Sequence, residues 1–114
     1  MFLLCKRLQY KLVGAIATHN KRLIQKFMDN GYSKFENYYR FGFVQLKKNT
    51  LIVGRETGQD TSIPFAKLLK GIIVYQQNLK LYHEGPAALR AFGITHINSP
   101  IHSLLHLLEI SDYE

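Results

Sequence analysis

The chain has 114 residues, of which 46% are apolar and 20% are charged, and its formal net charge is +7. This length suits one domain with a single core, and the composition excludes a disordered tail. The first fifty residues hold ten Lys or Arg and two carboxylates, whereas the remaining sixty-four hold five and six. We therefore predict one globular domain over residues 1–114, with a basic surface contributed by its amino-terminal half.

Cys5 is the single cysteine, so an internal disulfide is excluded, as are the paired thiols of zinc knuckles and redox motifs. No apolar run reaches the length of a signal-peptide core or a transmembrane helix. These features favour the cytoplasm and argue against a membrane partner. No motif for a cofactor or for catalysis is found, so we predict neither a cofactor nor catalytic residues.

Residues 6–14 alternate between apolar and polar side chains, which predicts a strand with one solvated face. From Thr18 the apolar residues recur at helical spacing, and Asn30-Gly31 offers a left-handed stop. We therefore expect a helix over roughly residues 19–29. Its apolar stripe consists of Leu23, Ile24, Phe27 and Met28.

An antiparallel meander of three strands follows. Residues 37–46 are rich in aromatic and β-branched side chains, with Tyr39, Phe41 and Phe43 expected on one face and Tyr38, Arg40 and Val44 on the other. Lys48-Asn49 predicts a tight turn into a strand over 51–53. A second turn over 56–59 leads to a short strand that ends at Pro64.

After Pro64 the pattern becomes helical, although the β-branched run from Ile72 leaves a strand over 72–76 as an alternative. Pro86 is expected to start a short helix that Gly93 ends. Ser99-Pro100 predicts the start of the last helix, with the Ser99 hydroxyl as its cap. That helix carries an apolar stripe of Ile101, Leu104, Leu105 and Leu108.

The predicted fold class is α+β. An antiparallel sheet of about four strands, the amino-terminal strand plus the meander, packs in two layers against one early helix and two to three carboxy-terminal helices.

The early cations are the main functional indication. They come from the first helix and from neighbouring strands and turns, and an aromatic ring among cations suits a surface where bases stack and phosphates are neutralised. We predict a nucleic-acid-binding site made of Lys6, Arg7, Lys11, Lys21, Arg22, Lys26, Lys34, Tyr38, Arg40, Lys47 and Lys48.

His102, His106 and Glu109 are spaced so that they would share one side of the last helix, and two imidazoles one turn apart can reach one divalent ion. No metal motif is matched, however. We therefore interpret these histidines as surface positions opposite the leucine stripe and predict no metal site.

The polar stretch 55–61 is interpreted as an exposed hairpin tip in which Arg55 pairs with Glu56 or Asp60. A second interpretation is a ribonuclease in which Arg55 binds the phosphate and either His19 or the His83-Glu84 pair acts as acid and base.

The sequence thus favours a small non-enzymatic protein that binds nucleic acid mainly through phosphate contacts. Two alternatives stay open. The first is a homo-oligomeric interaction module, built on the aromatic strand around residues 38–43 or on the leucine-rich last helix. The second is a small toxin-like ribonuclease.

Overall fold

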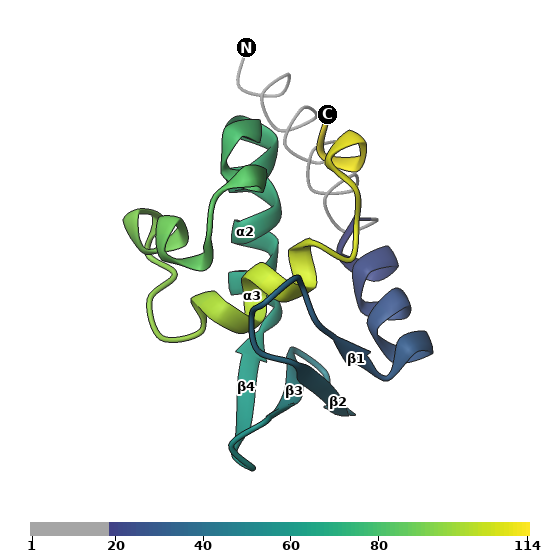
Figure 1. Ribbon diagram of the computed structural model, residues 1–114. Helices are drawn as coiled ribbons and strands as arrows, with labels where there is room; N and C mark the ends of the chain where they lie inside the picture. Colours follow the sequence, from purple (N-terminus) through teal and green to yellow (C-terminus); the bar gives the residue numbers. More distant parts are fainter. Residues whose placement is uncertain (1–18) are drawn as a thin grey trace.

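The fold is α+β, as predicted. The structure is a computed structural model that describes residues 19–114. One four-stranded antiparallel sheet follows a helix over residues 19–30, and helices follow the sheet (Figure 1). The strands lie in the order in which they occur along the chain: β1 (Tyr32–Ser33), β2 (Phe41–Leu46), β3 (Thr50–Arg55) and β4 (Asp60–Pro64).

The described edge of the sheet next to β2 is formed by β1, a two-residue strand that the sequence analysis did not predict. Tyr32 pairs with Gly42 and Ser33 with Phe41. The strand expected over residues 6–14 lies outside the described residues.

The β2 strand begins at Phe41, four residues later than expected. The amide of Tyr38 donates to the carbonyl of Phe35, 3.0 Å away, and closes a turn that includes Glu36, whose φ is +49°. Residues 34–40 therefore form a loop. Phe41 is buried and Phe43 packs against the core, as predicted, but Tyr39 is 66% exposed and does not share their face.

Both predicted turns are present. The amide of Lys47 donates to the carbonyl of Thr50, 2.8 Å away, and closes the β2–β3 turn. At the β3–β4 turn, the amides of Arg55 and Gly58 donate to the carbonyls of Gln59 and Arg55. Gly58 has a φ of +90°, which glycine adopts without a steric penalty.

Residues 65–77 form one continuous helix, α2 (Phe65–Gln77), which settles the alternative in favour of helix over 72–76. The β-branched residues are tolerated because they lie in the core: Ile72 is fully buried and Val74 is 5% exposed. Gly71 lets α3 approach closely, because a Cβ at this position would lie 3.1 Å from side-chain atoms of both Ile101 and Leu105.

The remaining elements are short. They are three 3₁₀ helices, η1 (Leu79–His83), η2 (Pro86–Phe92) and η3 (Ile110–Tyr113), and the helix α3 (Asn98–Leu105). The expected start at Pro86 and end at Gly93 are confirmed, with Gly93 in the left-handed region at a φ of +83°.

The predicted cap of α3 is wrong. The helix starts at Asn98, one residue before Ser99, and no side chain caps it. The side-chain amide of Asn98 instead donates to the carbonyl of Pro86, 3.0 Å away, which joins α3 to η2.

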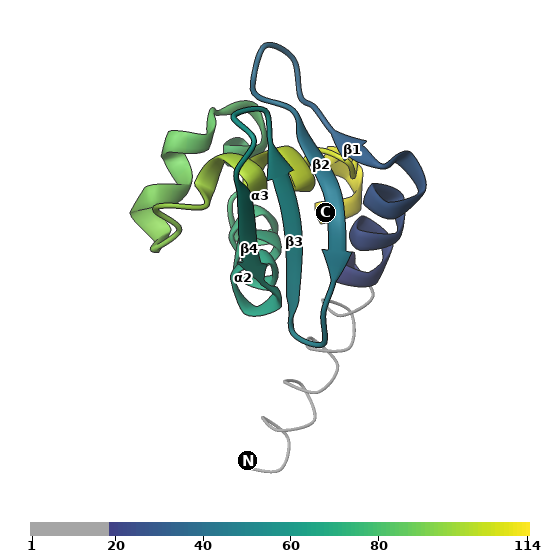
Figure 2. The same ribbon diagram turned by 90° about the horizontal axis from the view of Figure 1, so that it is seen from below.

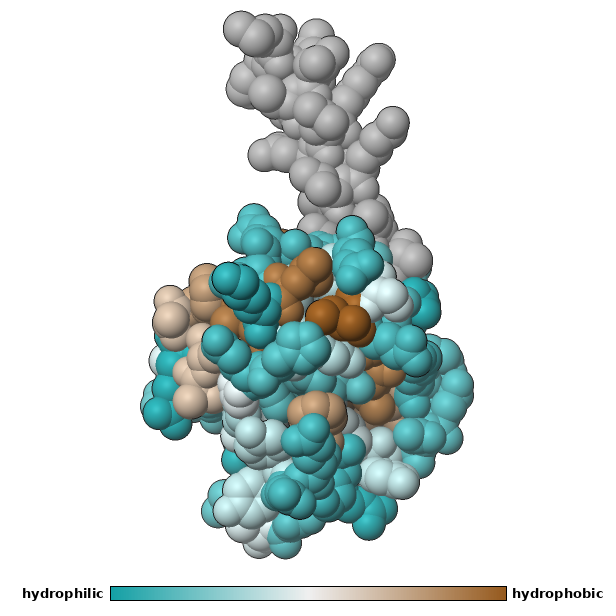
Figure 3. All heavy atoms as spheres, turned by 45° about the horizontal axis from the view of Figure 1, so that its top comes forward, coloured by the Kyte–Doolittle hydropathy of each residue, from teal (hydrophilic) through white to brown (hydrophobic). Residues whose placement is uncertain are grey.

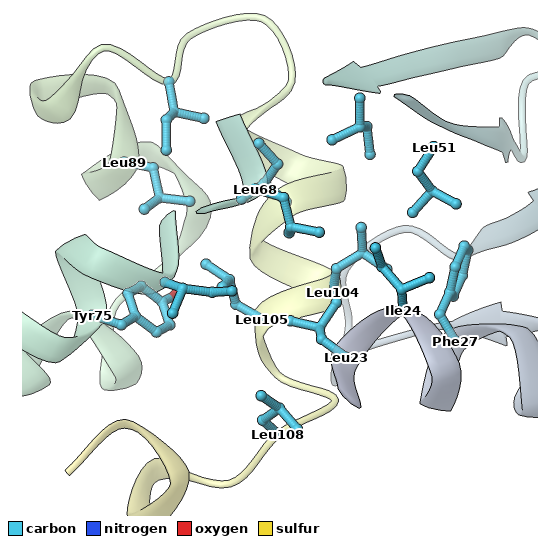
Figure 4. Packing of buried hydrophobic residues seen from close by; sticks show 14 of the residues in the cluster. Leu23, Ile24, Phe27, Leu51, Leu68, Tyr75, Leu89, Leu104, Leu105 and Leu108 are labelled. Carbon is cyan, nitrogen blue, oxygen red and sulfur yellow. The ribbon is translucent and has the colours of Figure 1, made fainter. Parts of the chain in front are cut away.

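The core lies between one face of the sheet and the helices that cover it (Figure 1). Leu23 and Phe27 of the first helix meet Leu51 of the sheet and Leu104 of α3, with Leu68 and Tyr75 supplied by α2 (Figure 4). The face seen in Figure 3 is mostly hydrophilic, with a small group of apolar side chains. Within residues 19–114, no helix is long and apolar enough to cross a bilayer.

Candidate nucleic-acid interface

The predicted cations that the structure describes come from three segments: the helix over residues 19–30, the loop over 34–40 and the β2–β3 turn. All seven are exposed: Lys21, Arg22, Lys26, Lys34, Arg40, Lys47 and Lys48. The other three, Lys6, Arg7 and Lys11, lie outside the described residues.

Figure 2 shows how these segments are arranged around the sheet. The helix over 19–30 lies beyond β1 and β2, whereas α2, η1 and η2 lie toward β4. The first helix and the 34–40 loop therefore carry their cations on the β1 side of the sheet, while Lys47 and Lys48 lie in the β2–β3 turn, at the other end of β2 from that loop. Elements on the β4 side carry Lys67, Lys70 and Lys80.

Three of the predicted cations have intramolecular partners. Arg22 forms an ion pair with Asp112, with 3.2 Å between Nη1 and Oδ1. Lys26 donates to the carbonyl of Leu107, and Lys34 to that of Glu36, 2.7 Å away. Arg22 and Lys26 thus hold the carboxy-terminal segment against the first helix.

The other four cations have no carboxylate within ion-pair distance among residues 19–114, where Arg22–Asp112 is the one ion pair found. The guanidinium of Arg40 lies 4.3 Å from the ring centroid of Tyr32, a cation–π contact. Lys21, Lys47 and Lys48 make no side-chain hydrogen bond within the same range. These are the cations most available to an anionic partner.

Tyr38 and Tyr39 line two different pockets. Tyr39 lines a pocket of about 330 Å³, here called the Arg55 pocket. The Arg55 guanidinium there donates to the Thr61 hydroxyl, 2.7 Å away, and lies 5.8 Å from the ring centroid of Phe41. The expected pairing of Arg55 with Glu56 or Asp60 is therefore wrong. Thr61 pairs with Val53 across the β3–β4 register and so shares a face of the sheet with Arg55.

Tyr38 lines a second pocket of about 290 Å³, here called the Tyr38 pocket, between the 34–40 loop and the end of η1. Its aromatic wall continues inward, because Phe35 stacks on His106 with 4.0 Å between ring centroids. Tyr82 packs on the same imidazole at 4.3 Å. The pocket is lined by Phe35, Glu36, Tyr38, Tyr82, His83, Glu84 and Gly85.

His102 is fully buried behind this wall, so its interpretation as a surface residue is wrong. Its Nε2 lies 3.1 Å from the carbonyl of Glu84, and its Nδ1 is buried with no hydrogen-bond partner within residues 19–114. Burial, together with the neighbouring His106, lowers the pKa of His102 to about 4, so the ring is neutral at pH 7.

One sequence signal pointed to this burial. Residues 91–108 contain no Lys, Arg, Asp or Glu, and a helix without a charged face is typically buried all round. In α3 every residue except Ser99 is buried. The leucine stripe of this helix is therefore internal and offers no surface for self-association.

The three members of the suggested metal set do not converge. His102 and His106 lie 4.4 Å apart by ring centroids, but both ring nitrogens of His106 lie 2.8 Å from backbone carbonyl oxygens. Glu109 is beyond the end of α3 and caps η3 with Asp112. No group of three His, Cys, Asp or Glu able to hold a metal occurs within residues 19–114.

The suggested ribonuclease residues are also separated. His19 contacts the carbonyl of Asp112 and stacks on Tyr113, His83 and Glu84 line the Tyr38 pocket, and Arg55 lies in the other pocket. Arg55 shares its pocket with neither His19 nor His83, and its guanidinium lies 3.5 Å from the backbone carbonyl of His96. The suggested bases and the suggested phosphate clamp are therefore not brought together.

Comparison with protein-family models, with curated protein sequences and with solved structures finds no match for this chain.

Proposed function

We propose that this protein binds nucleic acid through the cations on the β1 side of the sheet and in the β2–β3 turn. The main support is that these cations are exposed and that several have no counter-charge nearby. Lys21, Lys47 and Lys48 have no carboxylate within 4.0 Å among residues 19–114. Cations left without counter-charges on one side of a fold are the electrostatic footprint of a polyanion partner.

The proposal concerns phosphate contacts rather than readout of bases. Lys47 and Lys48 lie at the tip of a turn, where long side chains reach outward and follow a phosphate backbone. Arg40, resting on the ring of Tyr32, adds a planar guanidinium beside an exposed aromatic ring. Such a pair supports stacking with an unpaired base, so a single strand is the preferred partner.

The test is the salt dependence of binding to a fluorescein-labelled single-stranded RNA of mixed sequence and to its duplex, measured by anisotropy. Log affinity should fall linearly with log salt concentration, with a slope of about −0.7 for each phosphate contacted on the single strand. An affinity that does not change with salt would contradict the proposal.

A further inference from the structure

We propose that the Tyr38 pocket binds an organic ammonium group. The pocket is a cavity of about 290 Å³ whose lining combines aromatic rings with two carboxylates and includes no Lys or Arg. Aromatic faces attract cations through the negative charge of their π clouds. Carboxylates attract any ammonium group by charge and also accept hydrogen bonds from those that carry N–H.

The aromatic part of the pocket is held rigidly. Phe35 and Tyr38 stand with their rings parallel within 5° and their centroids 6.3 Å apart. His106 supports Phe35 from the inside, and the Tyr82 hydroxyl is fixed by a 2.9 Å bond to the carbonyl of Leu108. A ligand therefore meets rings that need little ordering before they bind it.

The acidic part consists of Glu36 and Glu84, which reach the pocket from segments far apart in the sequence. Both residues are exposed, and neither carboxylate has an ion-pair partner within residues 19–114. The Lys34 ammonium lies close by, 2.7 Å from the backbone carbonyl of Glu36, so two carboxylates stand against one neighbouring cation. The remaining negative charge favours a cationic ligand over a phosphate.

Two backbone features indicate that this arrangement is specifically built. Glu36 has a φ of +49°, the one positive value among the described non-glycine residues, and a glutamate held there costs roughly 1 kcal/mol. Gly85 leaves room for Tyr38, because a Cβ at position 85 would lie 2.9 Å from the Tyr38 hydroxyl oxygen. The strain at Glu36 is explained if its place beside the pocket serves a ligand.

This pocket is independent of the nucleic-acid proposal, because it uses carboxylates where that interface uses cations. The ammonium group has two sources, a small free amine or a lysine side chain of another protein. The two share the same chemistry at the pocket and differ in what surrounds the charged group.

The experiment is a titration of the ¹⁵N-labelled protein with choline and with its neutral isostere 3,3-dimethyl-1-butanol, followed by amide shifts. Choline should shift the amides of residues 35–38 and 82–85 saturably, with an affinity at least about tenfold higher than that of the alcohol. A lysine peptide and its norleucine counterpart form the second arm. Tighter binding of the lysine peptide than of choline assigns the group to a protein partner, and the reverse assigns it to a small amine.

The double variant Glu36→Gln/Glu84→Gln should lose at least about tenfold in affinity for choline, since it keeps the shape of the pocket and removes both charges. Glu56→Gln, at the other pocket, is the matched control and should bind as the parent protein does. Equal binding of choline and the alcohol, an unchanged affinity in the double variant, or no shifts with either ammonium ligand would overturn the proposal.

Discussion

Phe35 and His106 stack with 4.0 Å between their ring centroids, and this contact joins the loop before β2 to the end of α3. The imidazole also places both nitrogens 2.8 Å from the carbonyl oxygens of His102 and Tyr82. His106 is therefore the point where the 34–40 loop, η1 and α3 meet.

His106→Ala should lower the free energy of unfolding by about 2–4 kcal/mol, because it removes the stack and the ring contact with the carbonyl of Tyr82. Urea denaturation followed by circular dichroism measures this change. His96→Ala is the control, since His96 is exposed and its expected effect is within about 0.5 kcal/mol. Equal effects of the two substitutions would contradict the role given to His106.

His102 should make stability depend on pH. Burial and His106 lower its pKa from 6.5 to about 4 in the folded protein, so between these values the unfolded chain binds a proton that the folded chain does not. Stability should therefore be fully present above pH 6.5 and fall as the pH falls toward 4. The His102 contribution approaches about 1.4 kcal/mol per pH unit.

His102→Gln isolates this contribution, because the amide can still donate to the carbonyl of Glu84 but does not titrate. Denaturation midpoints at a series of pH values should decline less steeply in the variant than in the parent. Parallel pH profiles for the two proteins would show that His102 does not titrate as described.

Gly71 is expected to be required for the crossing of α2 and α3. Ala normally favours a helix interior by roughly 1 kcal/mol over Gly, but here its Cβ would lie 3.1 Å from atoms of Ile101 and Leu105. Gly71→Ala should therefore destabilise the protein by about 1–3 kcal/mol in thermal or chemical unfolding. Lys70→Ala, on the exposed side of the same helix, should change stability little, and a stabilising Gly71→Ala would refute this packing.

Replacing Asp112 should lower the stability of the fold more than replacing Arg22, its partner in the ion pair. The pKa of Asp112 is lowered first by the amide of Glu109, which donates to it over 2.9 Å, and then by Arg22. Asp112→Ala removes one of the two bonds of the capping box of η3 and should cost about 1 kcal/mol. Arg22→Ala removes an exposed pair and should cost less than about 0.5 kcal/mol. A larger loss for Arg22→Ala would reverse this assignment.

The sequence predicted the parts of the fold that local signals control. The turns at 47–49 and 56–59, the helix after Pro64 and the segment from Pro86 to Gly93 depend on residues with special backbone preferences, and all are present. The buried stripe of α3 followed from its spacing, because periodicity reports which side of a helix is apolar.

The features that were missed depend on contacts between distant segments. The two-residue strand β1 exists because it pairs with β2, and no local pattern marks it. His102 is buried because Glu84, the residue after η1, supplies its carbonyl and the 34–40 loop supplies two rings. The Tyr38 pocket is likewise formed by two segments that become neighbours only in the folded chain, and no sequence motif predicts it.

The most direct test of the central claim is a pair of triple charge reversals. Lys21, Lys47 and Lys48 changed together to Glu should weaken binding to single-stranded RNA at least about a hundredfold at low salt, and the salt slope should become shallower. Lys67, Lys70 and Lys80 changed to Glu alter the net charge equally on the β4 side and should weaken binding far less. Equal losses in the two variants would mean that net charge alone attracts the nucleic acid and would contradict an interface on the β1 side and the β2–β3 turn.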